Sequence, residues 1–396
     1  MSKPALIVWL GVALLLGACG GGGDNLPVSV PNAQALFVGP GPANNVNLLF
    51  TTVQICTPGS TSNCQSIDHV LVDTGSSGLR IISSLVNPSL SLQQQRDTAG
   101  RPIVECGQFV TGIIWGPVKI ADVRMAQEVA RSIPIQLIGD PAFPVPAGCS
   151  SAGLPLNTAQ ALGANGVLGV SMFVQDCGSA CSQGSPSVHF ICPTSSTCQP
   201  TQVSLVQQLQ NPVALFSRNN NGIVIDLPAV APSGAASVDG SLIFGIGTQG
   251  NNALGSARTI RVNPNNGVFT TVSRGVSYAN SFIDSGSNAL YFSNASIPVC
   301  STIQFQDFFC PTATQTLSAT LQGTSGSASV NFQVANAEHL FLANQTFFAF
   351  STLAGPAGPI SDGIFDWGLP FFFGRKVFIA IEGQGTPAGV GPYVAF

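Results

Sequence analysis

A short motif occurs twice in this chain, each time between two hydrophobic stretches. The first copy is Asp-Thr-Gly-Ser at positions 73–76, and the second is Asp-Ser-Gly-Ser at 284–287. Apolar stretches on either side of a glycine turn are typical of neighbouring β-strands. The two aspartates, Asp73 and Asp284, lie 211 positions apart in a chain of 396 residues. A duplication at this distance predicts two similar halves and a site to which each half contributes one carboxylate.

Charge is scarce along the whole chain. Charged residues make up 8% of the sequence, whereas an average globular domain has roughly 25%. The formal net charge is −4, and Lys and Arg form no basic run. Nucleic-acid binding needs clustered Lys and Arg, so this class of function is excluded. The length allows two domains, each large enough for its own core.

The N-terminus has the pattern of an export signal. The apolar run Ala5–Leu16 is too short to remain as a membrane span, which needs about 20 residues. It runs into Leu-Gly-Ala-Cys at 16–19, which resembles the bacterial lipobox. We therefore expect a signal peptide at 1–18 and a lipid on Cys19. A plain secretory signal with cleavage nearby is the alternative.

A lipid on Cys19 would anchor the protein in the membrane of the bacterial cell envelope, facing the periplasm or the cell surface. Residues 19–34 begin with the cysteine and four glycines, which predicts a flexible tether. The residue after Cys19 is glycine rather than aspartate. By analogy with enterobacterial lipoproteins, this favours the outer membrane.

The remaining ten cysteines are an even number in an exported chain, which predicts disulfides. Proximity in the sequence favours Cys56–Cys64 and Cys300–Cys310. Three further disulfides are expected, in a pairing that the sequence leaves open, among Cys106, Cys149, Cys177, Cys181, Cys192 and Cys198. The three histidines are dispersed and do not alternate with cysteines at ligand spacing, so we expect no metal and no other cofactor.

The pattern of apolar runs predicts an all-β fold. Runs rich in Val, Ile, Phe and Thr are separated by turns of Gly, Pro and Asn. The clearest predicted strands are Val46–Ile55, Gly112–Met125, Gly222–Leu227 and Val268–Val276. The main predicted helix is Thr201–Gln210, and two lesser candidates are Ala159–Leu162 and Ile297–Phe305.

Through its two Asp motifs, the chain resembles the pepsin-like aspartic peptidases. The resemblance covers most of the mature chain, and its specificity rests on the paired motifs. It implies a bilobal fold of two pseudo-symmetric β-barrel-like lobes with a cleft between them. We expect an N-terminal lobe at 35–250, with a Cys-rich insertion at 176–200, and a C-terminal lobe at 251–396. The chain also resembles an uncharacterised family of bacterial lipoproteins with the same two motifs.

The resemblance implies an aspartic endopeptidase, with Asp73 and Asp284 as its catalytic dyad. Two carboxylates at close range cannot both ionise, so one proton is shared. One carboxylate then removes a proton from a water molecule while the other protonates the peptide carbonyl. The substrate would be a polypeptide that binds in an extended conformation as an added strand. We expect a monomer.

The other motif residues would support this dyad. Glycines would let each backbone turn approach the opposite carboxylate. The final serine of each motif would donate to the outer carboxylate oxygen, and the second residue would bond across to the other motif. The support residues are Thr74, Gly75, Ser76, Ser285, Gly286 and Ser287.

The predicted flap departs from the family pattern. Residues 105–112 fit the flap hairpin in length, and Glu105 takes the place of a tyrosine. Arg80, seven residues after the first catalytic position, takes the place of a tryptophan. We hypothesise that Arg80 and Glu105 form an ion pair that replaces the aromatic contact. The alternative is two unrelated solvated charges. Gln108 and Phe109 are the other flap candidates.

Two segments resemble the family's hydrophobic-hydrophobic-glycine segments, which pack behind each catalytic aspartate. The first is Asn165–Gly169. The second would fall at Trp367–Pro370, where Pro370 stands in place of the expected glycine.

Two other functions compete with the endopeptidase. The altered flap and Pro370 favour a catalytically silent pepsin-fold binding or assembly lipoprotein of the envelope. The complete set of hydroxyls and glycines around both aspartates opposes it. A purely structural surface lipoprotein is the third reading, and only the Gly/Ser/Asn-rich composition supports it.

Overall fold

The computed structural model describes residues 31–183, 188–194, 197–358 and 363–396. Residues 31–396 belong to one compact unit. Strands hold 44% of the residues and helices 12%, so the predicted all-β class is confirmed. The predicted signal peptide, Cys19 and most of the tether lie outside the described residues. No helix in the described part of the chain has the length and apolar character needed to cross a membrane.

The elements have the following bounds. The strands are β1 (Ala33–Val38), β2 (Leu49–Cys56), β3 (Cys64–Asp73), β4 (Ser77–Ile82), β5 (Gln93–Gln94), β6 (Ile103–Phe109), β7 (Gly112–Met125), β8 (Glu128–Ile138), β9 (Gly166–Val170), β10 (His189–Thr194), β11 (Thr197–Pro200), β12 (Gly222–Leu227), β13 (Val238–Phe244), β14 (Thr259–Arg261), β15 (Phe269–Ser273), β16 (Val276–Ile283), β17 (Leu290–Phe292), β18 (Gln315–Gln322), β19 (Ser327–Val334), β20 (Ala354–Gly355), β21 (Phe365–Trp367), β22 (Arg375–Ala380), β23 (Gly385–Thr386), β24 (Gly389–Val390) and β25 (Tyr393–Ala395). The short helices are α1 (Ala147–Ser150), α2 (Ala159–Leu162), α3 (Ser179–Gln183) and α4 (Ala337–Ala343).

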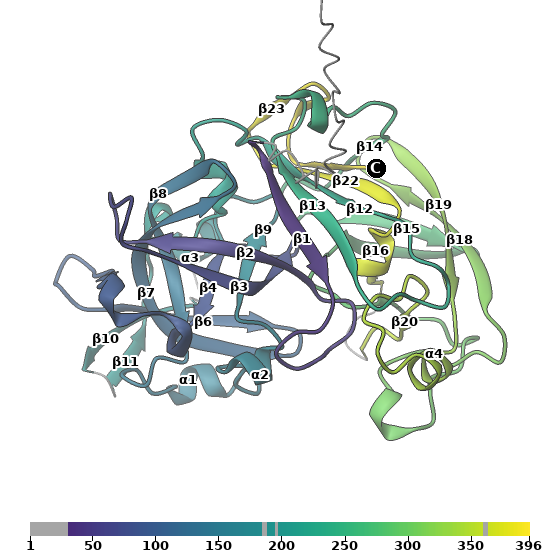
Figure 1. The fold of residues 1–396 in the computed structure, drawn as a ribbon, viewed down its shortest axis with the longest axis horizontal. Helices are drawn as coiled ribbons and strands as arrows, with labels where there is room; N and C mark the ends of the chain where they lie inside the picture. The colour runs from purple at the N-terminus through teal and green to yellow at the C-terminus, as the bar shows by residue number, and fades with distance from the viewer. Residues whose placement is uncertain (1–30, 184–187, 195–196, 359–362) are drawn as a thin grey trace, which may run out of the picture. The chain divides into compact units, whose positions relative to one another are not determined.

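The larger sheet has 16 strands, in the order β11-β10-β6-β7-β8-β4-β9-β3-β2-β1-β13-β12-β22-β25-β14, with β5 paired to β7. Because β2 pairs with β7 as well as with β3, this part of the sheet curls back on itself. The C-terminal strand β22 pairs with β12, so strands from distant parts of the sequence lie side by side (Figure 1). β12 is almost completely buried because both of its faces are packed, with Ile223 and Ile225 in one hydrophobic cluster and Val224 in another.

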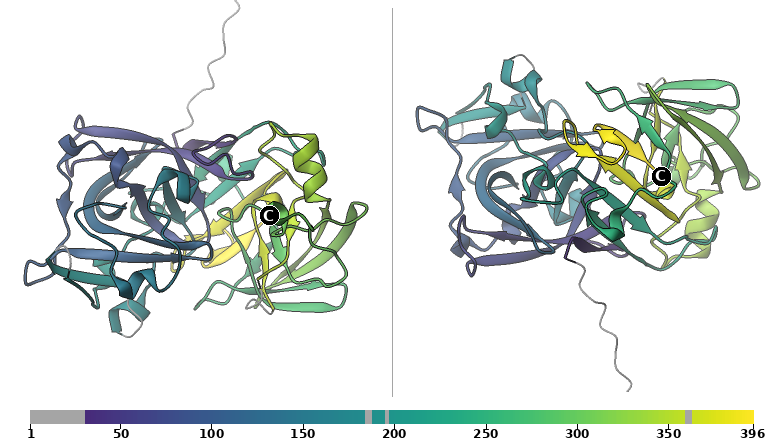
Figure 2. Two further views of the ribbon diagram at one scale, coloured as in Figure 1. Left: turned by 90° about the horizontal axis from the view of Figure 1, so that it is seen from below. Right: turned by 90° about the horizontal axis from the view of Figure 1, so that it is seen from above.

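A second sheet has seven strands, in the order β19-β18-β15-β16-β21-β17-β20, and β23 pairs with β24 in a small third sheet. In both views of Figure 2, the yellow C-terminal strands lie between the purple-to-teal strands of the larger sheet and the green strands of the seven-stranded sheet. One hydrophobic core draws on both sheets, from Leu36 in β1 to Phe292 in β17. The predicted lobe boundary at residue 250 stays a prediction.

One three-strand arrangement occurs in both sheets. β9 lies between β3 and β4, parallel to the first and antiparallel to the second. β21 lies between β16 and β17 with the same two orientations. The motif containing Asp73 connects β3 to β4, and the motif containing Asp284 connects β16 to β17. The repeated motif therefore belongs to a repeated strand unit.

The main helix prediction, Thr201–Gln210, is wrong. Only the 3-10 turn Leu205–Gln207 forms there. The side-chain amide of Gln208 hydrogen-bonds to both backbone groups of Gly178, and the Leu209 carbonyl accepts from the Asp176 amide. Pairing with the preceding segment therefore overrides the helix propensity of this Gln- and Leu-rich stretch.

Two other local predictions also need correction, whereas Ala159–Leu162 is a helix as predicted. In Ile297–Phe305 only the turn Ile303–Phe305 is helical, because the preceding backbone pairs across the Cys300–Cys310 disulfide. The predicted strand Val268–Val276 is two strands. Arg274 and Gly275 both have positive φ there, as a tight hairpin turn requires.

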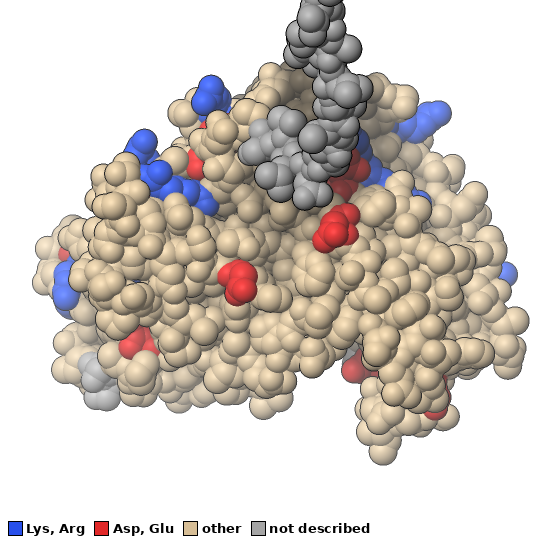
Figure 3. Space-filling view, viewed as in Figure 1, with Lys and Arg blue, Asp and Glu red and all other residues tan. Residues whose placement is uncertain are grey.

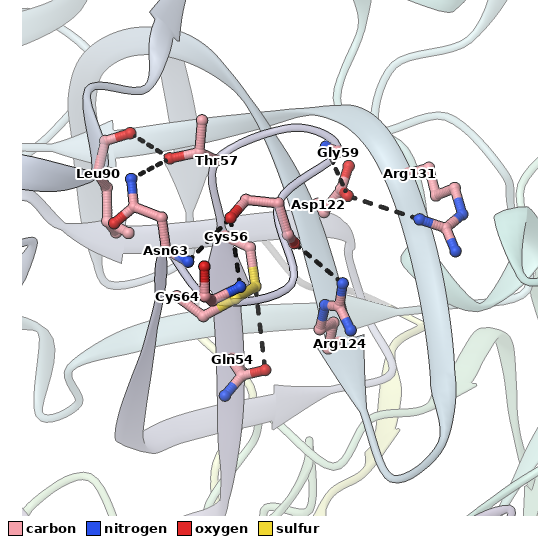
Figure 4. The surroundings of a disulfide bond; sticks show 12 residues. Gln54, Cys56, Thr57, Gly59, Asn63, Cys64, Leu90, Asp122, Arg124 and Arg131 are labelled. Atoms are coloured by element: carbon pink, nitrogen blue, oxygen red, sulfur yellow. Dashed lines mark hydrogen bonds and ion pairs between the residues drawn. A yellow bond between two sulfur atoms is a disulfide. The ribbon is translucent and has the colours of Figure 1, made fainter.

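All ten cysteines that follow Cys19 are paired. The two predicted pairs, Cys56–Cys64 and Cys300–Cys310, are confirmed. The pairs that the sequence left open are Cys106–Cys149, Cys177–Cys181 and Cys192–Cys198. Figure 4 shows Cys56–Cys64 across the ends of β2 and β3, beside buried Asp122, which accepts from the Gly59 amide.

Charged side chains are few and scattered on the face shown in Figure 3. Several of the acidic groups are instead buried, among them Asp73, Glu105, Asp122 and Asp366. Burial of an ionisable group is costly unless the group is paired or neutral. We therefore expect the partners that surround each of these buried acids to show whether it is paired with a cation or holds a proton.

Candidate active site

Asp73 and Asp284 occupy equivalent turns. Asp73 is the last residue of β3 and is 5% exposed, and Asp284 follows directly after β16 and is half-buried. In each turn the carboxylate oxygen Oδ1 accepts the backbone N–H of the motif glycine at 2.8 Å. The adjacent turn residue Gly75 is exposed, so the turns face solvent while the carboxyls are largely sheltered.

The last serine of each motif contacts the other oxygen of its aspartate. Ser76 donates through Oγ to Asp73 Oδ2, and Ser287 Oγ lies 3.0 Å from Asp284 Oδ2. The hydrogen bonds between each aspartate and its own motif span two or three residues, so the local sequence is sufficient to form them. Hydrogen bonds of this kind favour the ionised carboxylate.

The second residue of each motif bonds across to the other motif. The Ser285 amide donates to Thr74 Oγ1 at 2.9 Å, and the Thr74 amide donates to Ser285 Oγ at 3.2 Å. The two hydroxyls then donate onward, Thr74 to the Ile283 carbonyl and Ser285 to the Val72 carbonyl. Both residues are buried. This reciprocal set of four bonds joins the two turns directly.

The motif glycines allow the close approach that brings the carboxyls together. A Cβ on Gly75 would lie 3.0 Å from Asp284 Cγ, and a Cβ on Gly286 would lie 2.8 Å from Asp73 Oδ1. Burial, the charge of Asp73 and a hydrogen bond with Asp73 together raise the pKa of Asp284 well above its usual range. Two carboxyl groups in hydrogen-bond contact retain a proton between them.

A third carboxyl, Asp366, lies behind the second turn, and sequence reasoning missed its role. Its Oδ2 is 2.6 Å from Ser287 Oγ, and its Oδ1 is buried with no hydrogen-bond partner among the described residues. Burial raises the pKa of Asp366 to about 8, and the Asp73 charge adds to the effect. The sequence shows only that an acid lies between two large hydrophobic residues, the second of which is followed by a glycine.

The register corrects the prediction for Pro370. Asp73 is opposite Gly169, and Ile283 is opposite Trp367, which places Gly368 beside Asp284 in the equivalent position. A Cβ on Gly368 would lie 2.1 Å from the Ala289 carbonyl oxygen, so glycine is required there. The expected glycine is therefore present, and Pro370 lies in the following 3-10 turn. The pattern was misread because Asp366 replaces its first hydrophobic residue.

Arg80 lies behind the first turn, and the predicted ion pair with Glu105 is present. Its Nη2 is 2.7 Å from Glu105 Oε1 and 3.2 Å from Asp176 Oδ2, and the three side chains are at most 5% exposed. Its Nη1 donates to the Ser77 carbonyl at 2.7 Å, at the start of β4. These charges are therefore not solvated, and Asp176 is a partner that the sequence did not reveal.

The two acids that contact Arg80 have pKa values that are shifted in opposite directions. Burial alone would raise the pKa of Glu105, but the Arg80 charge outweighs it and lowers that pKa. Burial and the Glu105 charge raise the pKa of Asp176 well above its usual range, against the opposing charge of Arg80. Asp176 therefore keeps its proton to a higher pH than Glu105, which is the acid that the Arg80 charge stabilises in its ionised form.

The same cluster contains the only arrangement of metal-ligating side chains among the described residues. Atoms of Glu105, Asp176 and His189 lie within 4.8 Å of one another. The Arg80 guanidinium already contacts both acids, so a divalent cation would have to occupy a position beside a fixed positive charge. These residues do not fit a metal.

The other two flap candidates lie near the end of the β6–β7 hairpin. Gln108 is exposed, and Phe109 packs in a cluster with Ile82 and Ile114. The hairpin end is tied to the following segment, because Ile113 hydrogen-bonds with Leu154 and Leu156. Among the described residues, the Gln108 side chain makes no hydrogen bond to Asp73 or Asp284.

The fold and the site define an all-β protein in which two Asp-Ser/Thr-Gly-Ser turns meet. The chain belongs to the family described as "Protein of unknown function (DUF3443)", whose pattern matches residues 28–396. No curated protein matches the sequence.

Proposed function

We propose that this protein is an aspartic endopeptidase that hydrolyses peptide bonds with a water molecule activated by Asp73 and Asp284. The observation that carries the proposal is the meeting of two equivalent turns. The Cβ that a side chain at Gly286 would have lies 2.8 Å from Asp73 Oδ1 and 3.1 Å from Asp284 Oδ1, and the two turns have equivalent hydrogen bonds. A half-protonated pair contains both a base for the water and an acid for the carbonyl oxygen. Asp73 and Asp284 would exchange these roles within one proton-sharing unit.

The supporting residues have matching roles in this proposal. Ser76 and Ser287 would stabilise the charge on the outer oxygens. Thr74 and Ser285 would fix the spacing of the two carboxyls, because their four bonds link the turns rather than either turn to itself. A pepsin-like fold with one lobe from each repeated strand unit is part of the proposal. The repeat of β3-β9-β4 as β16-β21-β17 supports it.

The setting of the enzyme is also a proposal. A lipid on Cys19 would hold the monomeric protein at the bacterial cell envelope, facing the periplasm or the cell surface, with the outer membrane favoured. Its substrate would be a polypeptide in an extended conformation. The five disulfides agree with an exported protein, since such bonds persist in oxidising compartments.

The test is cleavage of a diverse peptide mixture by the full chain, purified in detergent with its disulfides formed. Products would be identified by mass spectrometry from about pH 3 to pH 7, the range in which a carboxyl pair is half-protonated. The Asp73→Asn variant is the control. We expect cleavage by the wild type alone. Equal cleavage by the variant would identify a contaminating peptidase, and no cleavage by folded wild type would contradict the proposal.

A second candidate is a pepsin-fold protein that binds envelope polypeptide without turnover. The observation that favours it is the hairpin end, where Val110 and Leu154 expose their apolar side chains. Two apolar residues on a fixed hairpin suit docking of a partner chain. Peptides captured without cleavage by both wild type and Asp73→Asn would favour this candidate.

A further inference from the structure

Ser287 contacts two carboxyl groups but has a single hydroxyl hydrogen. Its Oγ is 3.0 Å from Asp284 Oδ2 and 2.6 Å from Asp366 Oδ2. A hydroxyl donates one hydrogen bond and an ionised carboxylate donates none. Both contacts are hydrogen bonds only if one of the two acids carries a proton on the oxygen that faces Ser287. The geometry therefore requires a protonated acid at one end of this chain of three groups.

The surroundings favour Asp366 as the protonated acid. Its Oδ1 is buried and has no hydrogen-bond partner in the described part of the chain, whereas Asp284 Oδ1 accepts from the Gly286 amide. A charge on Asp366 would thus be divided over a buried oxygen with no donor, which is costly. The carbonyl oxygen of a neutral acid tolerates the same environment far better.

The strands around Asp366 offer no cation. On β21 it lies between Phe282 of β16 and Tyr291 of β17. The titratable groups that interact with it are Asp73, Asp284 and Tyr291, and burial, Asp366 and Asp307 all raise the pKa of Tyr291. Each neighbour is acidic or neutral. The electrostatic environment therefore agrees with the hydrogen count.

We propose that Asp366 carries a proton which it donates to Ser287, so that the single hydrogen of Ser287 is directed onto Asp284 Oδ2. Asp366 is thus a positioning residue that acts on the dyad through Ser287. The proposal rests on the proposed function only for its catalytic consequence. The proton on Asp366 and the orientation of Ser287 follow from the contacts alone.

The consequence concerns the first ionisation of the dyad. A hydroxyl that receives a hydrogen bond becomes a stronger donor, so Asp366 would strengthen the bond from Ser287 to Asp284. A bond to the ionised form lowers the pH at which the dyad loses its first proton. Without a donor at 366, Ser287 is free to turn away from Asp284. The acidic limb of the activity profile should then move to higher pH.

The test compares two substitutions at the same position. In Asp366→Asn the side-chain amide can still donate to Ser287, whereas in Asp366→Val no donor remains. We expect the acidic limb to stay in place for Asp366→Asn and to move up by about one pH unit for Asp366→Val, the size of one lost charged hydrogen bond. Ser287→Ala should move it equally, and adding Asp366→Val to Ser287→Ala should change nothing further.

A measurement without turnover separates this inference from the proposed function. In the full chain, with ¹³C in the aspartate side-chain carboxyls, one resonance should titrate near pH 8. It should be lost in Asp366→Asn and retained in Asp307→Asn, an exposed acid near Tyr291. The Asp284 resonance should show the same shift with Asp366→Val as the activity profile.

The outcomes are distinct. Titration of Asp366 near pH 4, or equal effects of the Asn and Val substitutions, would overturn the inference. A wild type that shows both carboxyl titrations but cleaves no peptide would remove the proposed function and leave the inference intact.

Discussion

Behind its aspartate, the first half of the site places a buried arginine, and the second half places a buried acid. The turns themselves are alike. Arg80 lies opposite Val167 of β9, and Tyr291 lies opposite Asp366 of β21. Arg80 and Tyr291 are equivalent, since each comes seven residues after its aspartate. In the first half the buried charged residue, Arg80, lies on β4, the strand that follows the turn. In the second half the buried acid, Asp366, lies on β21, the strand between the other two.

This difference shows that the two halves keep one geometry with different electrostatics. In the first half a cation compensates Glu105, and Nη1 of Arg80 holds the Ser77 carbonyl. In the second half the equivalent residue, Asn288, has its carbonyl held by the side chain of Asn47, and charge is avoided by a proton on Asp366. The two turns are alike, but a cation lies behind the first and a neutral acid behind the second. Asp73 and Asp284 therefore have different electrostatic surroundings.

The largest expected effect is the loss of peptide cleavage when either aspartate is replaced. It tests whether the two halves contribute equivalent carboxyls. Asp73→Asn and Asp284→Asn should each reduce peptide cleavage by at least about a thousandfold, because either substitution removes the shared proton chemistry. The measurement is kcat/KM on one peptide identified in the mixture, with unfolding curves as a control for the fold. A variant that retained more than a tenth of the activity would show that only one carboxyl is needed.

The next effect is on stability. It tests the difference between the buried arginine of the first half and the buried acid of the second. Arg80→Met should lower the free energy of unfolding by about 3–5 kcal/mol, since it leaves buried Glu105 without its cation. The matched change in the second half, Asp366→Val, introduces the type of residue found at Val167 and should cost far less, because it replaces a neutral acid. Urea unfolding at pH 7 measures both.

Its control is a double-mutant cycle. Combining Arg80→Ala with Glu105→Ala should recover part of the stability lost in each single variant, and the two should also be coupled in activity. Additive losses would mean that the ion pair does not support the hairpin that carries Glu105. Equal costs for Arg80→Met and Asp366→Val would remove the contrast between the halves.

Stability should also depend on pH through both regions. Asp366 and Asp176 have raised folded-state pKa values, so each binds a proton on folding at pH values where the unfolded chain has released it. Their contribution is complete below the unfolded pKa, near 4, and is lost as pH rises, up to about 8 for Asp366. The expected slope is about 1.4 kcal/mol per pH unit for each group.

Two variants assign this slope. Asp366→Asn and Asp176→Asn should each flatten the fall in unfolding free energy between pH 5 and pH 8, measured by urea at fixed ionic strength. The exposed Asp307→Asn should leave it unchanged. If neither Asp366→Asn nor Asp176→Asn changed the slope, both groups would have to be ionised in the folded protein over this range.

The sequence was sufficient for features whose contacts are local. The turn bonds of Asp73 and Asp284 span two or three residues, and the two predicted disulfides join cysteines that are 8 and 10 positions apart. The all-β class follows from the spacing of apolar runs. The ion pair of Arg80 with Glu105 was predicted from the family resemblance, because both departures fell on positions that are in contact in that fold.

The remaining features depend on contacts that a linear pattern does not contain. Asp366 lies 79 positions beyond Ser287, and Asp176 lies 96 beyond Arg80. Contacts over such distances cannot be predicted from the neighbouring residues. Because Asp366 stands where the pattern has a hydrophobic residue, the expected glycine at Gly368 was not recognised. The predicted helix at Thr201–Gln210 failed for the same reason, since its partners, Asp176 and Gly178, lie about 30 positions earlier in the chain.

The smallest effect tests whether the first half is also held more firmly by covalent links. Cys106–Cys149 closes 43 residues around the hairpin that carries Glu105, and Cys300–Cys310 closes 10 in the second half. Chain entropy predicts losses of about 4 and about 3 kcal/mol when each pair is replaced by alanine. The difference of about 1 kcal/mol should appear in urea unfolding of the two double variants. A larger loss from the second pair would show that local packing around Cys300, rather than loop length, sets the contribution of these bonds.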